Sequence, residues 1–198
     1  TDVVDYLDGG AGNDLLEGGI DRDTYYFARG YGQDMINDAP SDSGVRGMDY
    51  LRLGPDIDSS DLHFIRNGSS NDLTIEIIGT SDTITINNQF DAFDSQLLGV
   101  FWRYRVEAIL LDDGSGMSAD TIMSELLSQA GTQGADTIYG FFRDDRLNGG
   151  AGNDYLNGGN LNDTYVFGLG YGDDTVFDDT DTFTSGDRDA IEFLSSIG

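Results

Sequence analysis

Aspartates recur along this sequence at nine-residue intervals, most of them after a glycine-rich run, as in "GGAGNDLLEGGIDRD" at 9–23. Carboxylates and backbone carbonyls are the hard oxygen ligands of calcium, which takes about six to eight of them. The spacing therefore indicates repeated turns that bind a cation. The nine aspartates in this register are Asp5, Asp14, Asp23, Asp34, Asp136, Asp145, Asp154, Asp163 and Asp174, with two extra residues before the fourth and the ninth.

A short strand must follow each of these turns, because an apolar residue lies two positions after every aspartate in the register. We expect units of about six turn residues and three strand residues, each reversing the chain once, so that unit n stacks on unit n+2. Stacked strands lie about 4.8 Å apart, which would place the aspartates of stacked turns across a small gap. Glycine would aim the turn carbonyls into that gap. The apolar residues are Leu7, Leu16, Tyr25, Ile36, Ile138, Leu147, Leu156, Tyr165 and Val176.

A second repeat has a period of 140 residues. "DTYYFARGYGQD" at 23–34 recurs as "DTYVFGLGYGDD" at 163–174, and "DYLRL" at 49–53 falls where "DAIEF" does at 189–193. The sequence thus begins inside one module and stops early in the next. We expect it to be a piece of a longer array, although a truncated tandem duplication would look the same.

The region between the repeat blocks, 39–130, has ordinary mixed patterning. Alternating apolar residues predict strands at 62–66, 73–78 and 83–87, the last two joined as a hairpin. A further strand is predicted at 102–111, before the turn at 112–114. A helix is predicted at 118–131, with Ser118 or Asp120 as its N-cap and apolar positions 122, 123, 126 and 127 on one face.

The charge balance excludes several classes of function. The formal net charge is −27, and the ten basic residues are all arginine, so nucleic acid and anionic membranes would be repelled. The absence of cysteine excludes disulfides, thiolate metal sites and a cysteine nucleophile. No apolar run approaches the roughly 18 residues of a membrane span, and no signal peptide is visible.

Both repeat blocks resemble the RTX nonapeptide, GGxGxDxUx, in which U is large and apolar. The resemblance covers 1–38 and 131–178, and 72–90 resembles the β-rich unit that caps such blocks. It implies a predominantly all-β fold in which two right-handed parallel β-rolls flank a small β-rich capping unit with one short helix. The regions expected are 1–38 (roll), 39–130 (capping unit), 131–178 (roll) and 179–198 (start of a second capping unit).

The resemblance also implies calcium ligands, roughly five ions in all. The carboxylate pairs would be Asp5 with Asp23, Asp14 with Asp34, Asp136 with Asp154, Asp145 with Asp163, and Asp154 with Asp174. Carbonyls at the glycine positions would complete each shell: Gly10, Gly12, Gly19, Asp21, Gly30, Gly32, Gly134, Gly150, Gly152, Gly159, Leu161, Gly170 and Gly172. Asp21 and Leu161 each replace the second glycine of a turn. Phe141 and Arg143 replace both glycines of "GFFRDD" at 140–145, so the Asp145 site departs furthest from the family.

The function implied is a calcium-binding module of a secreted bacterial protein, exported by type I secretion and folding on calcium outside the cell. Its partners would be calcium and neighbouring modules, not nucleic acid. An alternative is recognition of an extracellular ligand by the middle unit, through an aromatic patch near Trp102. Catalysis within the chain is the weakest hypothesis, although the parent protein could be an exoenzyme or cytolysin.

Three other features favour a structural role over a functional one. His63 is the sole histidine, and we expect it to be a packed or surface residue. "FWRYR" at 101–105 is expected to pack its alternate residues while Arg103 and Arg105 pair with acids. "DDTDTFTSGDRD" at 178–189 is expected to be a solvated acidic loop.

Overall fold

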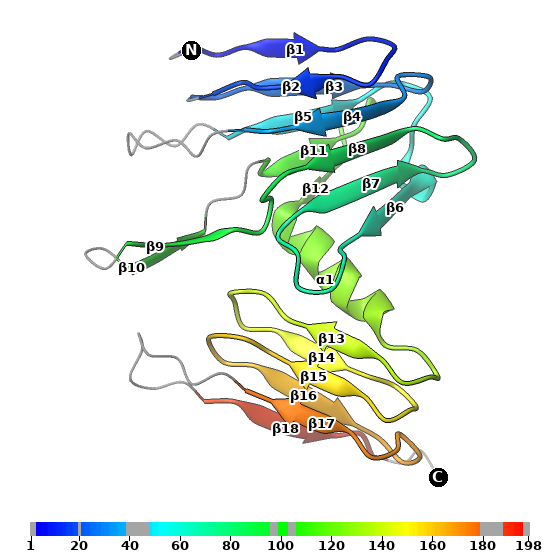
Figure 1. Cartoon of the computed structure of the whole chain (residues 1–198), viewed down its shortest axis with the longest axis vertical. Helices are drawn as coiled ribbons and strands as arrows, with labels where there is room; N and C mark the ends of the chain where they lie inside the picture. The colour runs from blue at the N-terminus through cyan, green and yellow to red at the C-terminus, as the bar shows by residue number, and fades with distance from the viewer. Residues whose placement is uncertain are drawn as a thin grey trace. The chain divides into compact units, whose positions relative to one another are not determined.

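The structure is a computed structural model, which describes residues 3–19, 21–38, 48–95, 99–102, 106–178 and 188–195. It forms two compact units, Thr1–Ile122 and Met123–Gly198. Strands dominate the described residues and parallel pairing dominates the rolls, which confirms the predicted fold class (Figure 1). No helix in the described ranges has the length and apolar character needed to cross a membrane.

The roll of the first unit is formed by two sheets, and successive strands from β1 to β5 alternate between them (Figure 1). One sheet has the parallel strands β1 (Tyr6–Asp8), β3 (Thr24–Phe27), β5 (Tyr50–Leu53) and β11 (Ala108–Leu110), then antiparallel β12 (Gly116–Ser118). The other has parallel β2 (Leu15–Leu16), β4 (Gln33–Ile36) and β8 (Thr83–Ile86), then antiparallel β7 (Leu73–Ile77) and β6 (Leu62–Ile65). A short 3-10 helix, η1 (Ser59–Asp61), precedes β6.

The core of this unit is built from the apolar residues that follow the aspartates. Tyr25 pairs with Leu7 on one side and with Leu51 on the other, so units two apart in the sequence are stacked, as predicted. Tyr25 and Leu51 have no exposed surface, because alternate residues of each strand point between the two sheets. Ile36, paired with Leu16 and Ile86, does the same in the second sheet.

The middle region extends both sheets of the first roll, through β11 and β8. The predicted β7–β8 hairpin is present, with Gly79 in its turn at φ 83°. The single strand predicted at 102–111 is wrong: β10 (Gly99–Trp102) pairs with β9 (Ala92–Ser95), and β11 begins only at Ala108. Val106 cannot continue a strand, since the Gln89 side chain bonds both its N–H, at 3.0 Å, and its carbonyl, at 2.6 Å.

The predicted helix is α1 (Ala119–Ala130). The Ser118 hydroxyl accepts the Thr121 N–H at 3.2 Å, which is the N-cap bond expected at this end. Ile122, Met123 and Leu127 are buried, so the predicted apolar face packs inward.

The second unit repeats the roll with two three-stranded parallel sheets. One has β13 (Thr137–Tyr139), β15 (Tyr155–Asn157) and β17 (Thr175–Phe177), and the other has β14 (Arg146–Asn148), β16 (Thr164–Phe167) and β18 (Ala190–Phe193). Leu156 and Leu147 are fully buried and Tyr165 nearly so, and these three side chains form the centre of a narrow core.

Replacing Leu156 by alanine should lower the free energy of unfolding of the second unit by about 2–5 kcal/mol, because it removes a fully buried side chain and leaves a cavity. Val176→Ala is the matched control. Val176 pairs with Leu156 from the neighbouring strand β17 but is 38% exposed, so its replacement should cost about 1 kcal/mol or less. Denaturant titration measures both, and equal losses would contradict this description of the core.

Candidate metal centre

In each roll the aspartates of successive stacked turns are joined by hydrogen bonds into a ladder. The backbone N–H of one aspartate donates to Oδ1 of the aspartate in the stacked turn, so the hydrogen bond that aligns two coils also fixes a carboxylate between them. The structure therefore places all five predicted pairs together, while their role as ligands stays a prediction. The N···Oδ1 distances are 2.8 Å for Asp5–Asp23, 3.0 Å for Asp14–Asp34, and 2.9 Å for each of Asp136–Asp154, Asp145–Asp163 and Asp154–Asp174.

The ladder extends beyond the residues that sequence reasoning selected. Asp23 N–H donates to Asp49 at 2.6 Å, and Asp163 N–H donates to Asp189 at 2.9 Å. Asp49 N–H in turn donates to the Glu107 carboxylate at 2.5 Å, which ends the first ladder. Asp49 and Asp189 each lie two positions before an apolar strand residue, Leu51 and Ile191, so the aspartate-to-apolar spacing could have revealed them although they fall outside the nine-residue register.

The second oxygen of several ladder carboxylates is buried without a hydrogen-bond donor in the described part of the chain. Burial raises the pKa of Asp23 and of Asp34, and a nearby carboxylate adds to each shift. Burial also raises the pKa of Asp163 to about 8, with Asp145, Asp189 and Asp178 adding to the effect. Buried anions of this kind need a cation, and the donor set fits calcium. The unpartnered atoms are Oδ2 of Asp14, Asp23, Asp34, Asp154 and Asp163.

The glycine turns bring backbone carbonyls to the same gaps. A Cβ on Gly172 would lie 1.6 Å from the Gly152 carbonyl oxygen, and one on Gly152 would lie 2.3 Å from that of Gly134. The stacked turns therefore lie so close together that any side chain at Gly152 or Gly172 would clash with the backbone of the neighbouring turn. Asp21 and Leu161 replace glycine yet keep the left-handed backbone, at φ 91° and 75°, so these two turns retain their shape.

The predicted glycine positions divide into two groups by backbone angle. Most of these glycines have positive φ. In the first block, the Asp82 carboxylate stabilises the turn at 30–32 by accepting the N–H groups of Gly30, at 2.7 Å, and Gly32, at 3.2 Å. Gly134 is the exception among the predicted glycines, since it does not have positive φ. Those with positive φ are Gly10, Gly12, Gly19, Gly30, Gly32, Gly150, Gly152, Gly159, Gly170 and Gly172.

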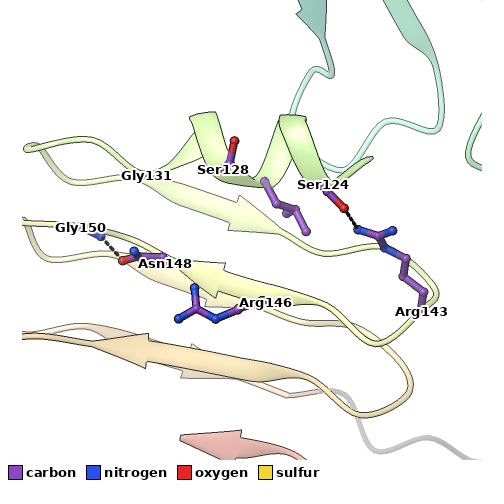
Figure 2. Close-up of a pocket in the computed structure, with 8 residues that line it drawn as sticks. Ser124, Ser128, Gly131, Arg143, Arg146, Asn148 and Gly150 are labelled. Carbon is purple, nitrogen blue, oxygen red and sulfur yellow. Dashed lines mark hydrogen bonds between the residues drawn. The ribbon is translucent and has the colours of Figure 1, made fainter. Parts of the chain in front are cut away.

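The Asp145 turn is built differently, as its missing glycines suggested. Arg143 Nε donates to Asp145 Oδ1 at 2.8 Å, and the Phe141 N–H donates to Oδ2. Arg143 also donates to the Ser124 hydroxyl of α1 at 3.0 Å (Figure 2). Both oxygens of this fully buried carboxylate are thus partnered by the chain itself, and a guanidinium supplies the positive charge.

A pocket of about 430 Å³ lies beside this turn, between α1 and the first coil of the second roll (Figure 2). Its two arginines are already ion-paired, Arg143 with Asp145 and Arg146 with Glu192 at 3.0 Å. The pocket therefore offers no obvious binding site for an anion.

The remaining sequence features lie outside the predicted turn pairs, and some lie partly outside the described residues. His63 is exposed and contacts Glu76 at 3.1 Å, as expected of a surface residue. Nothing is described of the Trp102 side chain or of 103–105. Within 178–189 only 178, 188 and 189 are described, and Asp178 and Asp189, which were expected in a solvated acidic loop, are both exposed. Asp178 accepts the Tyr165 hydroxyl at 3.1 Å, and Asp189 belongs to the ladder.

A parallel β-roll with glycine turns and stacked carboxylate pairs defines the class of calcium-binding repeat proteins. The RTX calcium-binding nonapeptide repeat (4 copies) matches residues 1–33 and 130–165, and the haemolysin-type calcium binding protein related domain matches 72–121. The chain therefore belongs to the RTX family, with calcium-binding repeats in two blocks. A related protein is the iron-regulated protein FrpA of Neisseria meningitidis serogroup C, 35% identical over 129 residues, which are 65% of this chain. The match spans 10% of FrpA.

Gly172→Ala should weaken calcium binding and folding far more than Gly170→Ala. Both glycines have positive φ, at 106° and 82°, so both variants carry the same kind of backbone strain. A Cβ on Gly172 meets the Gly152 carbonyl, whereas one on Gly170 has nothing within 4 Å. We expect a calcium midpoint about tenfold higher for Gly172→Ala than for Gly170→Ala, equivalent to about 1.4 kcal/mol. Similar midpoints would show that close stacking of the turns is unimportant.

The ion-free protein should be most structured in acid. Because burial raises the pKa of Asp163 from 3.8 to about 8, the folded state holds a proton that the unfolded chain has lost. This stabilisation is complete below about pH 4 and is lost as the pH rises to about 8. Circular dichroism in chelator across this window measures it. A β signal that is constant or grows with pH would contradict the burial of these carboxylates.

Proposed function

We propose that this chain is a calcium-triggered folding module of a secreted bacterial protein. The observation that carries the proposal is the set of buried carboxylate oxygens that have no donor in the described part of the chain and lie beside glycine turns in both blocks. Calcium would be held at four of the predicted pairs, with Arg143 in place of the ion at the fifth, Asp145–Asp163. The four pairs are Asp5–Asp23, Asp14–Asp34, Asp136–Asp154 and Asp154–Asp174.

The energetics favour coupling between binding and folding. The net charge of −27 opposes compaction, and stacking places like charges next to one another in every coil. Each coil adds few buried side chains, so backbone entropy is poorly compensated without the ion. A site that exists only in the folded state makes its binding free energy a folding free energy.

Calcium-dependent folding is compatible with export of the chain in its unfolded state. A chain that stays unfolded at low calcium could pass a type I secretion channel and fold outside the cell, where the ion is abundant. Extracellular modules function with calcium affinities on the order of 10⁻⁴–10⁻³ M. The RTX repeats in this chain support the proposal, as proteins of that family are typically secreted.

Recognition of an extracellular ligand by the middle unit is a second candidate. The β9–β10 hairpin favours it, because within the described residues these strands pair only with each other and with neither roll sheet. Trp102 lies at the end of this hairpin. On this hypothesis Trp102→Ala would abolish partner binding and leave calcium-induced folding unchanged.

Among the aspartates of the four proposed calcium pairs, Asp154→Ala should be the most damaging, since Asp154 belongs to two of the pairs and stacks on both Asp136 and Asp174. We expect the calcium midpoint for gain of β structure to rise about tenfold or more, which corresponds to about 1.4 kcal/mol or more. Circular dichroism during calcium titration, with magnesium in parallel, measures the shift. Asp173→Ala is the matched control, because this aspartate is exposed in the same stretch of chain. An unchanged midpoint in Asp154→Ala would refute the turn sites.

A further inference from the structure

Three aspartates meet at the end of the second roll. Carboxylate oxygens of Asp163, Asp178 and Asp189 all lie within 4.8 Å of one another. Asp163 ends a glycine turn, Asp178 follows β17, and Asp189 precedes β18. Asp178 and Asp189 are outside the nonapeptide register, so neither is a ligand of the predicted turn pairs.

Asp163 is directed into this cluster and lacks a partner there. It is 1% exposed, and its Oδ2 has no hydrogen-bond donor among the described residues. The Cβ position of Gly158 lies 2.1 Å from this oxygen and 2.5 Å from the Tyr165 hydroxyl oxygen, so both atoms converge on the same glycine. Asp178 and Asp189 are exposed, which leaves the cluster open to solvent.

Hydrogen bonds hold the three side chains in this arrangement. Asp189 Oδ1 accepts the Asp163 N–H at 2.9 Å, and Asp178 Oδ1 accepts the Tyr165 hydroxyl at 3.1 Å. The Tyr165 hydroxyl in turn accepts the Gly158 N–H at 3.1 Å. Burial raises the pKa of Tyr165, with Asp178 contributing, so this hydroxyl keeps its proton and remains a donor.

The same hydrogen-bond pattern occurs 140 residues earlier in the first roll, around Asp23, Asp38 and Asp49, which are all buried. Asp49 accepts the Asp23 N–H at 2.6 Å, and Asp38 accepts the Tyr25 hydroxyl at 2.7 Å. The Tyr25 hydroxyl accepts the Gly18 N–H at 3.0 Å. Asp23 is fully buried and its Oδ2 also lacks a donor among the described residues. Because this hydrogen-bond pattern occurs in two separate units, we regard the placement of the three aspartates as a built feature of the fold.

We propose that the second unit holds one further calcium ion outside its nonapeptide turns, at Asp163, Asp178 and Asp189. Three carboxylates, a nearby hydroxyl and access to water match the hard oxygen set of calcium. The ion would join the strand that leaves the last coil, β17, to the strand that re-enters the roll, β18. This inference rests on the proposed calcium-binding function.

Counting bound ions tests the proposal. Equilibrium dialysis of the whole chain against radioactive calcium, at a concentration that saturates the wild type, gives the stoichiometry. Asp178→Asn removes one charge and keeps an oxygen to accept the Tyr165 hydroxyl. This variant should bind one ion fewer than the wild type. Asp173→Asn, the same substitution at an exposed aspartate, should bind the full number.

The possible results separate this proposal from the one on which it rests. If the wild type binds no calcium, the proposed function fails. If the wild type binds calcium and Asp178→Asn binds as many ions as Asp173→Asn, the additional site is overturned. Asp189→Asn provides a second variant, on the other side of the same cluster, should Asp178→Asn not fold. It must lose the same single ion, and a full complement in Asp189→Asn would also overturn the site.

Discussion

The hydrogen bonds that stack the coils of this protein also bring negatively charged carboxylates close together. The N–H group of each ladder aspartate must find an acceptor, and it finds the carboxylate of the next stacked turn, as Asp154 does with Asp174 at 2.9 Å. Alignment of the strands therefore draws carboxylates into the gaps between turns. In Asp23, Asp34, Asp154 and Asp163 the backbone satisfies one oxygen, and the other is buried with no donor among the described residues, so a cation bound there would complete the set of interactions.

The two units differ in the interactions that can offset this crowding of negative charge. In the first, strands from the middle region extend both sheets and bury further side chains such as Ile75 and Ile84. The second has two three-stranded sheets in its described residues and a narrow core around Leu156. It also has Arg143, which gives one turn a permanent positive charge. We infer that the second roll begins from a coil that needs no ion and depends on calcium for the coils that follow.

The sequence predicted the parts of this structure that are local and periodic. A nine-residue period determines which strands are neighbours, so the core residues and the five aspartate pairs follow directly from spacing. Glu107 could not be found in this way, because 58 residues separate it from Asp49. The break before β11 was missed for the same reason, as it depends on a bond between Val106 and the distant Gln89 side chain. Arg143 was recognised as a departure, but its salt bridge is visible only in three dimensions.

The central claim is that calcium creates the fold and does not merely decorate it. The most direct measurement is far-ultraviolet circular dichroism together with hydrodynamic radius while calcium is titrated into chelator-stripped protein at neutral pH, with magnesium as the control ion. The account predicts an expanded chain without calcium, then a cooperative gain of β structure and compaction that magnesium does not reproduce. A chain that is already compact and rich in β structure in chelator would contradict it.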